Sequence, residues 1–137
     1  MFLNPKLRFQ IIWRLDDMKI QLKNWIVKDL NLSNVNDGKD TFNFAVGAYF
    51  GDSKHDFNIG FKVEVNNTSF TLSAEIIFSF TVDTEIDEQF KTSNFVKINA
   101  PAIAFPYVRS IITTITMQCG YQGVILPSIN FVKASEK

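Results

Sequence analysis

Three stretches in the middle of the chain place an apolar side chain at every second position. The apolar members are Phe42, Phe44, Val46, Ala48 and Phe50; Phe57, Ile59, Phe61, Val63 and Val65; and Phe70, Leu72, Ala74, Ile76, Phe78, Phe80 and Val82. A period of two predicts strands that bury one face and expose the other. The links at 51–56 and 66–67 are short and made mostly of turn-forming residues, which predicts hairpins. We therefore predict an antiparallel meander that is apolar on one face.

The residues before this meander also favour strands. Between residues 18 and 32, the first apolar side chains, Ile20 and Leu22, occupy even-numbered positions. Trp25 and Val27 then occupy odd-numbered positions. This change indicates a bulge near Asn24 or a strand buried on both faces. The polar residues at 33–40 predict an exposed connection to the meander.

The first seventeen residues form an arm that can be interpreted in two ways. Most of its apolar residues alternate with polar ones, which favours an extra strand: Leu7, Phe9, Ile11, Trp13 and Leu15. Leu7, Ile11 and Leu15 alone would also share one face of a helix. The sheet is therefore predicted to have four strands, or five if the arm joins it.

Residues 106–119 predict a helix that covers the apolar face of the sheet. Pro106 suits the first helical position and Gly120 the residue just past the end. One helix face would carry the apolar residues Val108, Ile111, Ile112, Ile115 and Cys119. The β-branched run at 111–116 favours a strand by composition, but a strand would point Ile111 and Ile112 to opposite faces.

Composition limits the class of protein. A chain of 137 residues with 46% hydrophobic and 20% charged residues suits one domain over 1–137, with the arm 1–17 least certain. Fourteen basic residues balance fourteen acidic ones, so we expect no nucleic-acid partner. Charges interrupt every apolar run near the N-terminus, so we expect a cytoplasmic protein without integral membrane association. Cys119 is the one cysteine in the sequence, and we expect it to be a small buried apolar residue.

Residues suited to catalysis are scattered, so we predict no enzyme, no metal and no cofactor. His55 is the one histidine and lies in a predicted turn beside Asp56. The acidic residues of the segment 83–99 lack a fixed spacing with it and fit a solvated loop: Asp83, Glu85, Asp87 and Glu88. Motifs for zinc, for a nucleophile elbow and for phosphate binding are missing.

One longer motif spans the predicted helix and the residues that follow it. Its members are Phe105, Pro106, Tyr107 and Arg109, then Gly120 and Tyr121, then Leu126, Asn130 and Phe131. Together with KNWIVKDLNLS at 23–33, this motif resembles the SecB export-chaperone family over residues 19–131. The resemblance implies an α+β fold, with a four- or five-stranded antiparallel sheet and one long C-terminal helix packed against it.

The resemblance also implies a function, namely ATP-independent holding of non-native polypeptides by a homo-oligomer, either a dimer or a dimer of dimers. Candidates for core and client groove together are Phe44, Phe61, Phe78, Phe80, Ile103, Phe105 and Tyr107. Candidates for the oligomer contact on the helix are Arg109, Ile112, Thr113 and Thr116. Fourteen phenylalanines are more than one small core demands, which leaves apolar surface for both contacts.

The sequence departs from the family pattern at several positions, and these departures are compatible with two different kinds of client. Asp29 retains one acidic position of the surface that receives the motor protein SecA in the family, but Ser33, Thr71 and Ser73 occupy the other acidic positions. Six residues follow Phe131, so we expect the second helix and acidic tail of the family to be absent. The chain could therefore serve preprotein export or be the dedicated chaperone of a toxin–antitoxin pair. A small carrier of apolar ligands is the alternative from another class.

Overall fold

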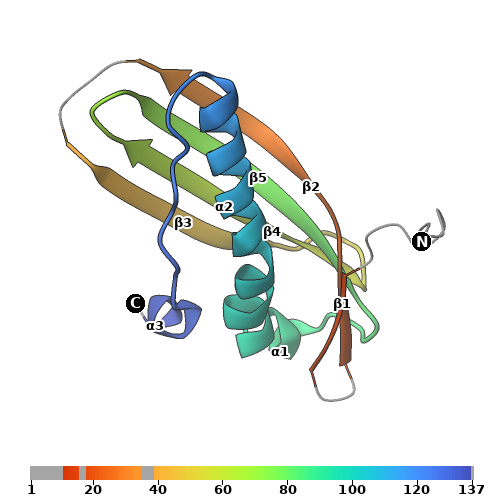
Figure 1. The fold of residues 1–137 in the computed structure, drawn as a ribbon. Coiled ribbons are helices and arrows are strands. Elements are labelled where there is room, and N and C mark those ends of the chain that lie inside the picture. The colour runs from red at the N-terminus through yellow and green to blue at the C-terminus, as the bar shows by residue number, and fades with distance from the viewer. Residues whose placement is uncertain (1–10, 16–17, 35–38, 137) are drawn as a thin grey trace, which may run out of the picture.

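The computed structural model describes residues 11–15, 18–34 and 39–136, which form a sheet with helices on one face (Figure 1). Five strands make up the sheet: β1 (Ile11–Leu15), β2 (Met18–Ser33), β3 (Thr41–Tyr49), β4 (Asp56–Asn66) and β5 (Thr71–Val82). Their order is β1-β2-β5-β4-β3, and every neighbouring pair is antiparallel. The predicted meander is confirmed as β3, β4 and β5. The described part of the N-terminal arm is a strand, whereas Leu7 and Phe9 lie outside the described residues.

Strand β2 contains the predicted bulge. Its register with β5 shifts between Leu22 and Asn24, and again between Val27 and Asp29. The first shift moves Trp25 onto the same face as its partner Phe78, which is fully buried. The change of parity in the sequence therefore reflects a bulge rather than a strand buried on both faces.

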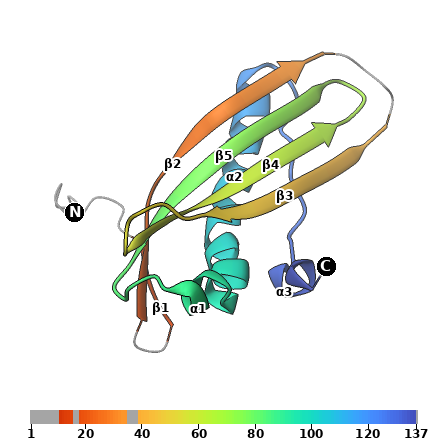
Figure 2. The ribbon, with the colours of Figure 1, turned by 180° about the vertical axis from the view of Figure 1, so that it is seen from behind.

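The apolar alternation of β4 and β5 becomes the core of the protein. Every residue predicted to face inward on these two strands is buried, from Phe57 to Val65 and from Phe70 to Val82. The edge strand β3 follows the same alternation, but its inward residues remain only half-buried or exposed. Figure 2 shows the opposite face of the sheet, which none of the described helices covers.

The helix layer begins earlier than predicted. It consists of α1 (Glu88–Lys91), a π-helical turn η2 (Phe95–Asn99), α2 (Ala100–Gln118) and α3 (Phe131–Ser135). The predicted start of α2 at Pro106 is wrong, because Pro101 occupies its first turn and Pro106 lies inside it. Pro106 is exposed, so water can reach the carbonyl group that loses its backbone donor. The predicted end is confirmed, because Gly120 follows the helix with a φ of 92°.

Two segments predicted to be irregular contain short helices. Asp87 caps α1 by accepting a hydrogen bond from the Phe90 amide at 2.8 Å, so one of the acidic loop residues has a structural role. Asn130 caps α3 by accepting hydrogen bonds from the amides of Val132 and Lys133 at 3.0 and 3.2 Å. This cap stabilises a short helix that begins at Phe131, in the part of the chain where we expected the second helix of the family to be absent.

Truncating Phe78 should show how much the sheet depends on its aromatic core. The side chain is fully buried and contacts Phe61 with ring centroids 5.9 Å apart. Phe78→Ala is expected to lower the free energy of unfolding by about 3–5 kcal/mol, measured by urea denaturation. Ile125→Ala is the control, because Ile125 is 81% exposed and its change should lie within about 0.5 kcal/mol. Equal effects of the two substitutions would contradict this core.

Candidate functional site

Strand β3 is an open edge of the sheet. It is last in the strand order, so one side of its backbone has no strand partner within the described ranges. Phe42 and Phe44 point towards the helix layer and are half-buried, with their rings stacked at 5.9 Å. Figure 2 shows β3 at the opposite margin of the sheet from β1. An unpaired strand beside half-covered aromatic rings is a surface on which another chain can pair.

Two hollows lie along β3, one at each end. The first pocket has a volume of about 370 Å³ and lies between the end of β3 and the helices. Its apolar lining includes Val46, Phe50, Ile59, Val96, Pro101 and Phe131. The second pocket has a volume of about 350 Å³ and lies between the start of β3 and the segment after α2. Its apolar lining includes Phe42, Val65, Val124, Leu126 and Pro127.

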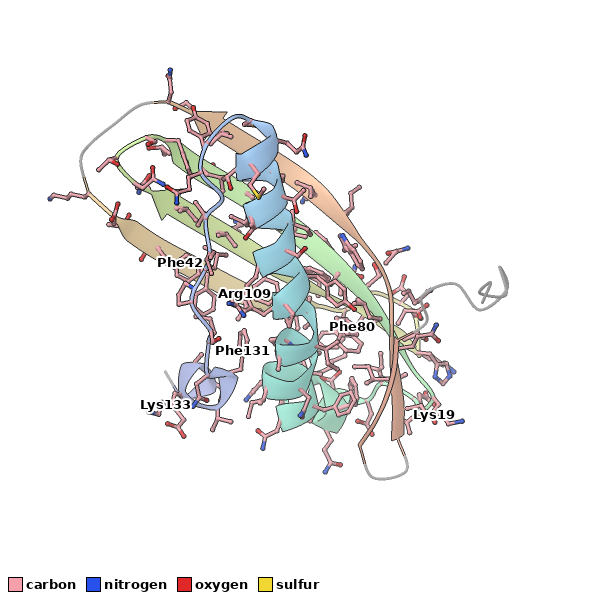
Figure 3. All side chains as sticks on the ribbon, in the orientation of Figure 1. Lys19, Phe42, Phe80, Arg109, Phe131 and Lys133 are labelled. Carbon is pink, nitrogen blue, oxygen red and sulfur yellow. The ribbon has the colours of Figure 1, made fainter. Side chains whose placement is uncertain are left out.

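The segment 121–130 forms one wall of the second pocket and is held by side chains of α2. Arg109 donates from Nε to the Leu126 carbonyl at 3.1 Å, and the Thr113 hydroxyl donates to the Val124 carbonyl. The Val124 amide donates to the Thr116 hydroxyl at 3.2 Å. Gly123 permits this close approach, because a Cβ there would lie 2.8 Å from the Met117 side chain. Figure 3 shows Arg109 and Phe42 on the side of α2 along which this segment runs.

The structure divides the predicted groove residues into two groups. Phe61, Phe78 and Phe80 are fully buried and Phe105 is 3% exposed, so these four form the core of the single chain. Phe44, Ile103 and Tyr107 are half-buried and keep apolar surface accessible. The predicted mixture of core and groove roles therefore divides by burial: the first group belongs to the core, and the groove role remains a prediction for the second. Phe42, Val46 and Phe50 also line the pockets along β3 and were not among the candidates, although their alternation with Phe44 was visible in the sequence.

The four residues predicted to form the oligomer contact all have roles inside the chain, and the two that are fully buried have no surface left for a partner subunit. Ile112 and Thr116 are fully buried, while Arg109 and Thr113 bond to the returning segment. Helical periodicity placed Ile112 on the face towards the sheet, but no periodic pattern indicated that residues 121–130 would cover the neighbouring face. The exposed face of α2 instead carries Ala102, Pro106, Ser110, Thr114 and Met117.

A second apolar surface lies where α2 meets β2. Tyr107 packs on Trp25 with ring centroids 4.8 Å apart, yet Trp25 remains 43% exposed and Leu30 42% exposed. Four half-buried residues spaced by four along α2 continue this surface: Ile103, Tyr107, Ile111 and Ile115. The sequence signal for it was the bulge that turns Trp25 towards the helix.

The outer face of the sheet carries Asp29, the acidic residue singled out in the sequence. Asp29 pairs in register with Glu75 of β5, whose neighbours Ala74 and Ile76 point into the core. Lys28 lies 3.6 Å from the Glu75 carboxylate. Ser33 pairs with Thr71 nearby, so two acidic residues and several small polar ones share this region. Glu75 was not singled out from the sequence.

Other kinds of site receive no support from the described residues. His55 places Nδ1 within 3.1 Å of the carbonyl oxygens of Val82 and Thr84, which is a local structural contact. Within the described ranges, His, Cys, Asp and Glu side chains nowhere gather in a group that could hold a metal ion. None of the described helices combines the length and hydropathy that a membrane crossing requires. Cys119 was expected to be buried, but it is exposed at the end of α2.

The β3 edge of the sheet is thus unpaired among the described residues, flanked by apolar pockets and backed by a single helix layer, a geometry that can accept an extended polypeptide segment. Sequence comparison gives the family. The chain belongs to the SecB family, because residues 15–135 match the model of preprotein translocase subunit SecB.

Individual relatives match over shorter segments. The chain is 41% identical over 71 residues to the protein MJ0357 of Methanocaldococcus jannaschii, and 38% identical over 61 residues to protein-export protein SecB of Anaplasma phagocytophilum. These segments cover 52% and 44% of this chain, and 44% and 38% of the two relatives' own lengths.

Solved structures share the fold at low sequence identity. The SecB-like chaperone Rv1957 of Mycobacterium tuberculosis, in complex with a ChAD peptide from the HigA1 antitoxin, superposes with a TM-score of 0.63 at 11% identity. That match covers 80% of this chain and 90% of Rv1957. A protein of Streptococcus agalactiae gives a TM-score of 0.59 at 17% identity, over 81% of this chain and 98% of that one. The predicted sheet-and-helix fold and the family are thus both confirmed.

Replacing Thr116 should loosen the segment that walls the second pocket. Thr116→Val keeps the shape of the side chain but removes the acceptor of the Val124 amide. We expect a loss of about 1–2 kcal/mol in the free energy of unfolding and faster hydrogen exchange at the Val124 amide. Thr114→Val is the matched control, because Thr114 is exposed on the same helix. Unchanged exchange at Val124 would contradict the proposed anchoring.

Proposed function

We propose that the protein is an ATP-independent holding chaperone that binds extended apolar segments of non-native polypeptides along β3. The observation that carries this proposal is the open β3 edge with an apolar pocket at each end. The backbone of a client would pair with the free side of β3, and its alternate side chains would enter the pockets. Holding a client in this way involves no covalent step, and we propose that it takes place in the cytoplasm.

The two kinds of client suggested by the sequence have separate support. Similarity to the Anaplasma SecB favours preprotein export, and the antitoxin peptide bound by Rv1957 favours a dedicated partner. We propose general holding for export as the main activity, with a toxin–antitoxin role as the second candidate.

Export also requires transfer to SecA, for which Asp29 and Glu75 form the proposed acidic contact. Export is favoured if the wild-type protein retains purified SecA and the Asp29→Lys variant does not. Equal retention of SecA by the two proteins would count against export.

Holding activity should depend on the helix-facing side of β3. We expect the protein to suppress light scattering by a denatured client, at stoichiometric amounts and without ATP. Val46→Asp should weaken this protection several-fold, because Val46 is 36% exposed and lines the first pocket. An aspartate there would replace apolar surface against which a client side chain must be buried with a hydrated carboxylate, in a pocket that Lys97 also lines.

Ala45→Asp is the matched control for this experiment. Ala45 is the preceding residue of the same strand, pairs with Lys62 and is exposed on the outer face. The control should protect the client as the wild type does. Absence of protection by the wild type, or equal loss in both variants, would contradict the proposed site.

A homo-oligomer, either a dimer or a dimer of dimers, is proposed to form through the exposed face of α2 and the apolar surface beside β2. Small side chains at Ala102, Ser110 and Thr114 allow two helices to approach closely, and Trp25 and Leu30 expose apolar area nearby. Ser110→Arg should lower the mass measured by light scattering in solution, whereas Gln89→Arg on α1 should not. A wild-type monomer at high protein concentration would rule out this assembly.

A further inference from the structure

The charged residues at the first pocket are both basic. Lys91 and Lys97 line it together with apolar residues, and none of the acidic residues that the structure describes lines it. Among the described residues, Asp40 is the charged residue that lines the second pocket. The linings of the two pockets therefore carry charges of opposite sign.

The two lysines differ in how far their charge is already compensated. Lys91 lies 3.0 Å from the Glu88 carboxylate and 5.6 Å from the centre of the Phe50 ring. Glu88 has a 91% exposed side chain, so a competing carboxylate can replace it at little cost. Lys97 is exposed and has no acidic partner within ion-pair distance among the described residues. The rim of the first pocket is thus positive beside an apolar floor.

We infer that the first pocket selects client segments in which an aspartate or glutamate lies next to a large apolar side chain. This inference rests on the proposed function and gives it a client preference. The apolar side chain would occupy the space bounded by Val46, Ile59 and Pro101, while the neighbouring carboxylate reaches Lys97. The partner is an internal acidic and apolar stretch of polypeptide, because β3 extends past the pocket towards the second one.

The size of the preference follows from the exposure of the rim. Contacts between exposed charges contribute little to affinity and are screened by salt. Reversing the peptide charge should therefore change affinity by about five-fold at low ionic strength. The apolar contribution should persist at high salt, because it does not depend on charge.

The test uses three extended peptides with blocked termini and the same aromatic and aliphatic residues. They differ only at one position beside the apolar run, which is Glu, Gln or Lys. Titration with the full-length protein should give the tightest binding for Glu and the weakest for Lys, with the difference lost in about 1 M salt. A Gln peptide with a free C-terminal carboxylate should bind no more tightly than its blocked form, and tighter binding would overturn the assignment to an internal acid.

Lys97→Glu should reverse the order of the peptides without changing the apolar part of the affinity. Lys62→Glu is the matched control, since it makes the same change of net charge on the outer face of β4 and should keep the wild-type order. Equal binding of the three peptides, or an order unchanged in Lys97→Glu, would overturn the inference and leave the holding function standing. Failure of every peptide to bind would overturn the holding function itself.

Discussion

The contacts of the Phe131 ring hold the candidate site together. Its centroid lies 6.2 Å from that of Phe44 on the edge strand, 6.3 Å from Phe61 in the sheet core and 5.7 Å from Phe105 on α2. Edge-to-face packing of this kind stabilises each pair beyond the burial of area alone. One ring therefore fixes the distance between β3, α2 and the C-terminal helix, and that distance sets the shape of the first pocket.

A single main helix over a five-stranded sheet leaves both flanks of the apolar face only partly covered. The inward residues of β4 and β5 lie under the helix layer and are buried, whereas β3 on one flank and the later part of β2 on the other keep exposed or half-buried apolar side chains. A folded monomer rarely leaves large connected apolar surfaces open unless they bind something. The width of the sheet relative to its cover thus accounts for two separate surfaces, one beside β3 and one beside Trp25.

The strand pattern was predictable because burial on one face imposes a period of two, and the inward residues of β4 and β5 follow it without exception. The start of α2 was not predictable from Pro106, because a proline inside a helix is tolerated where the lost hydrogen bond faces water. The roles of Arg109 and Thr113 depend on the path of residues 121–130, which has no periodic signal. Local sequence therefore identified the apolar residues, but tertiary contacts decided which of them remain accessible.

The accessible flanks differ in their polar surroundings, which supports the separate roles proposed for them. Beside Trp25 the exposed helix face carries small uncharged residues, and a second copy of the same chain could approach it without burying an unpaired charge. Beside β3 the pocket rims carry lysines at one end and an aspartate at the other. Exposed charges around an apolar floor favour reversible contacts, because they stay hydrated when the surface is empty. A holding chaperone requires such a surface, since it must release the segments that it binds.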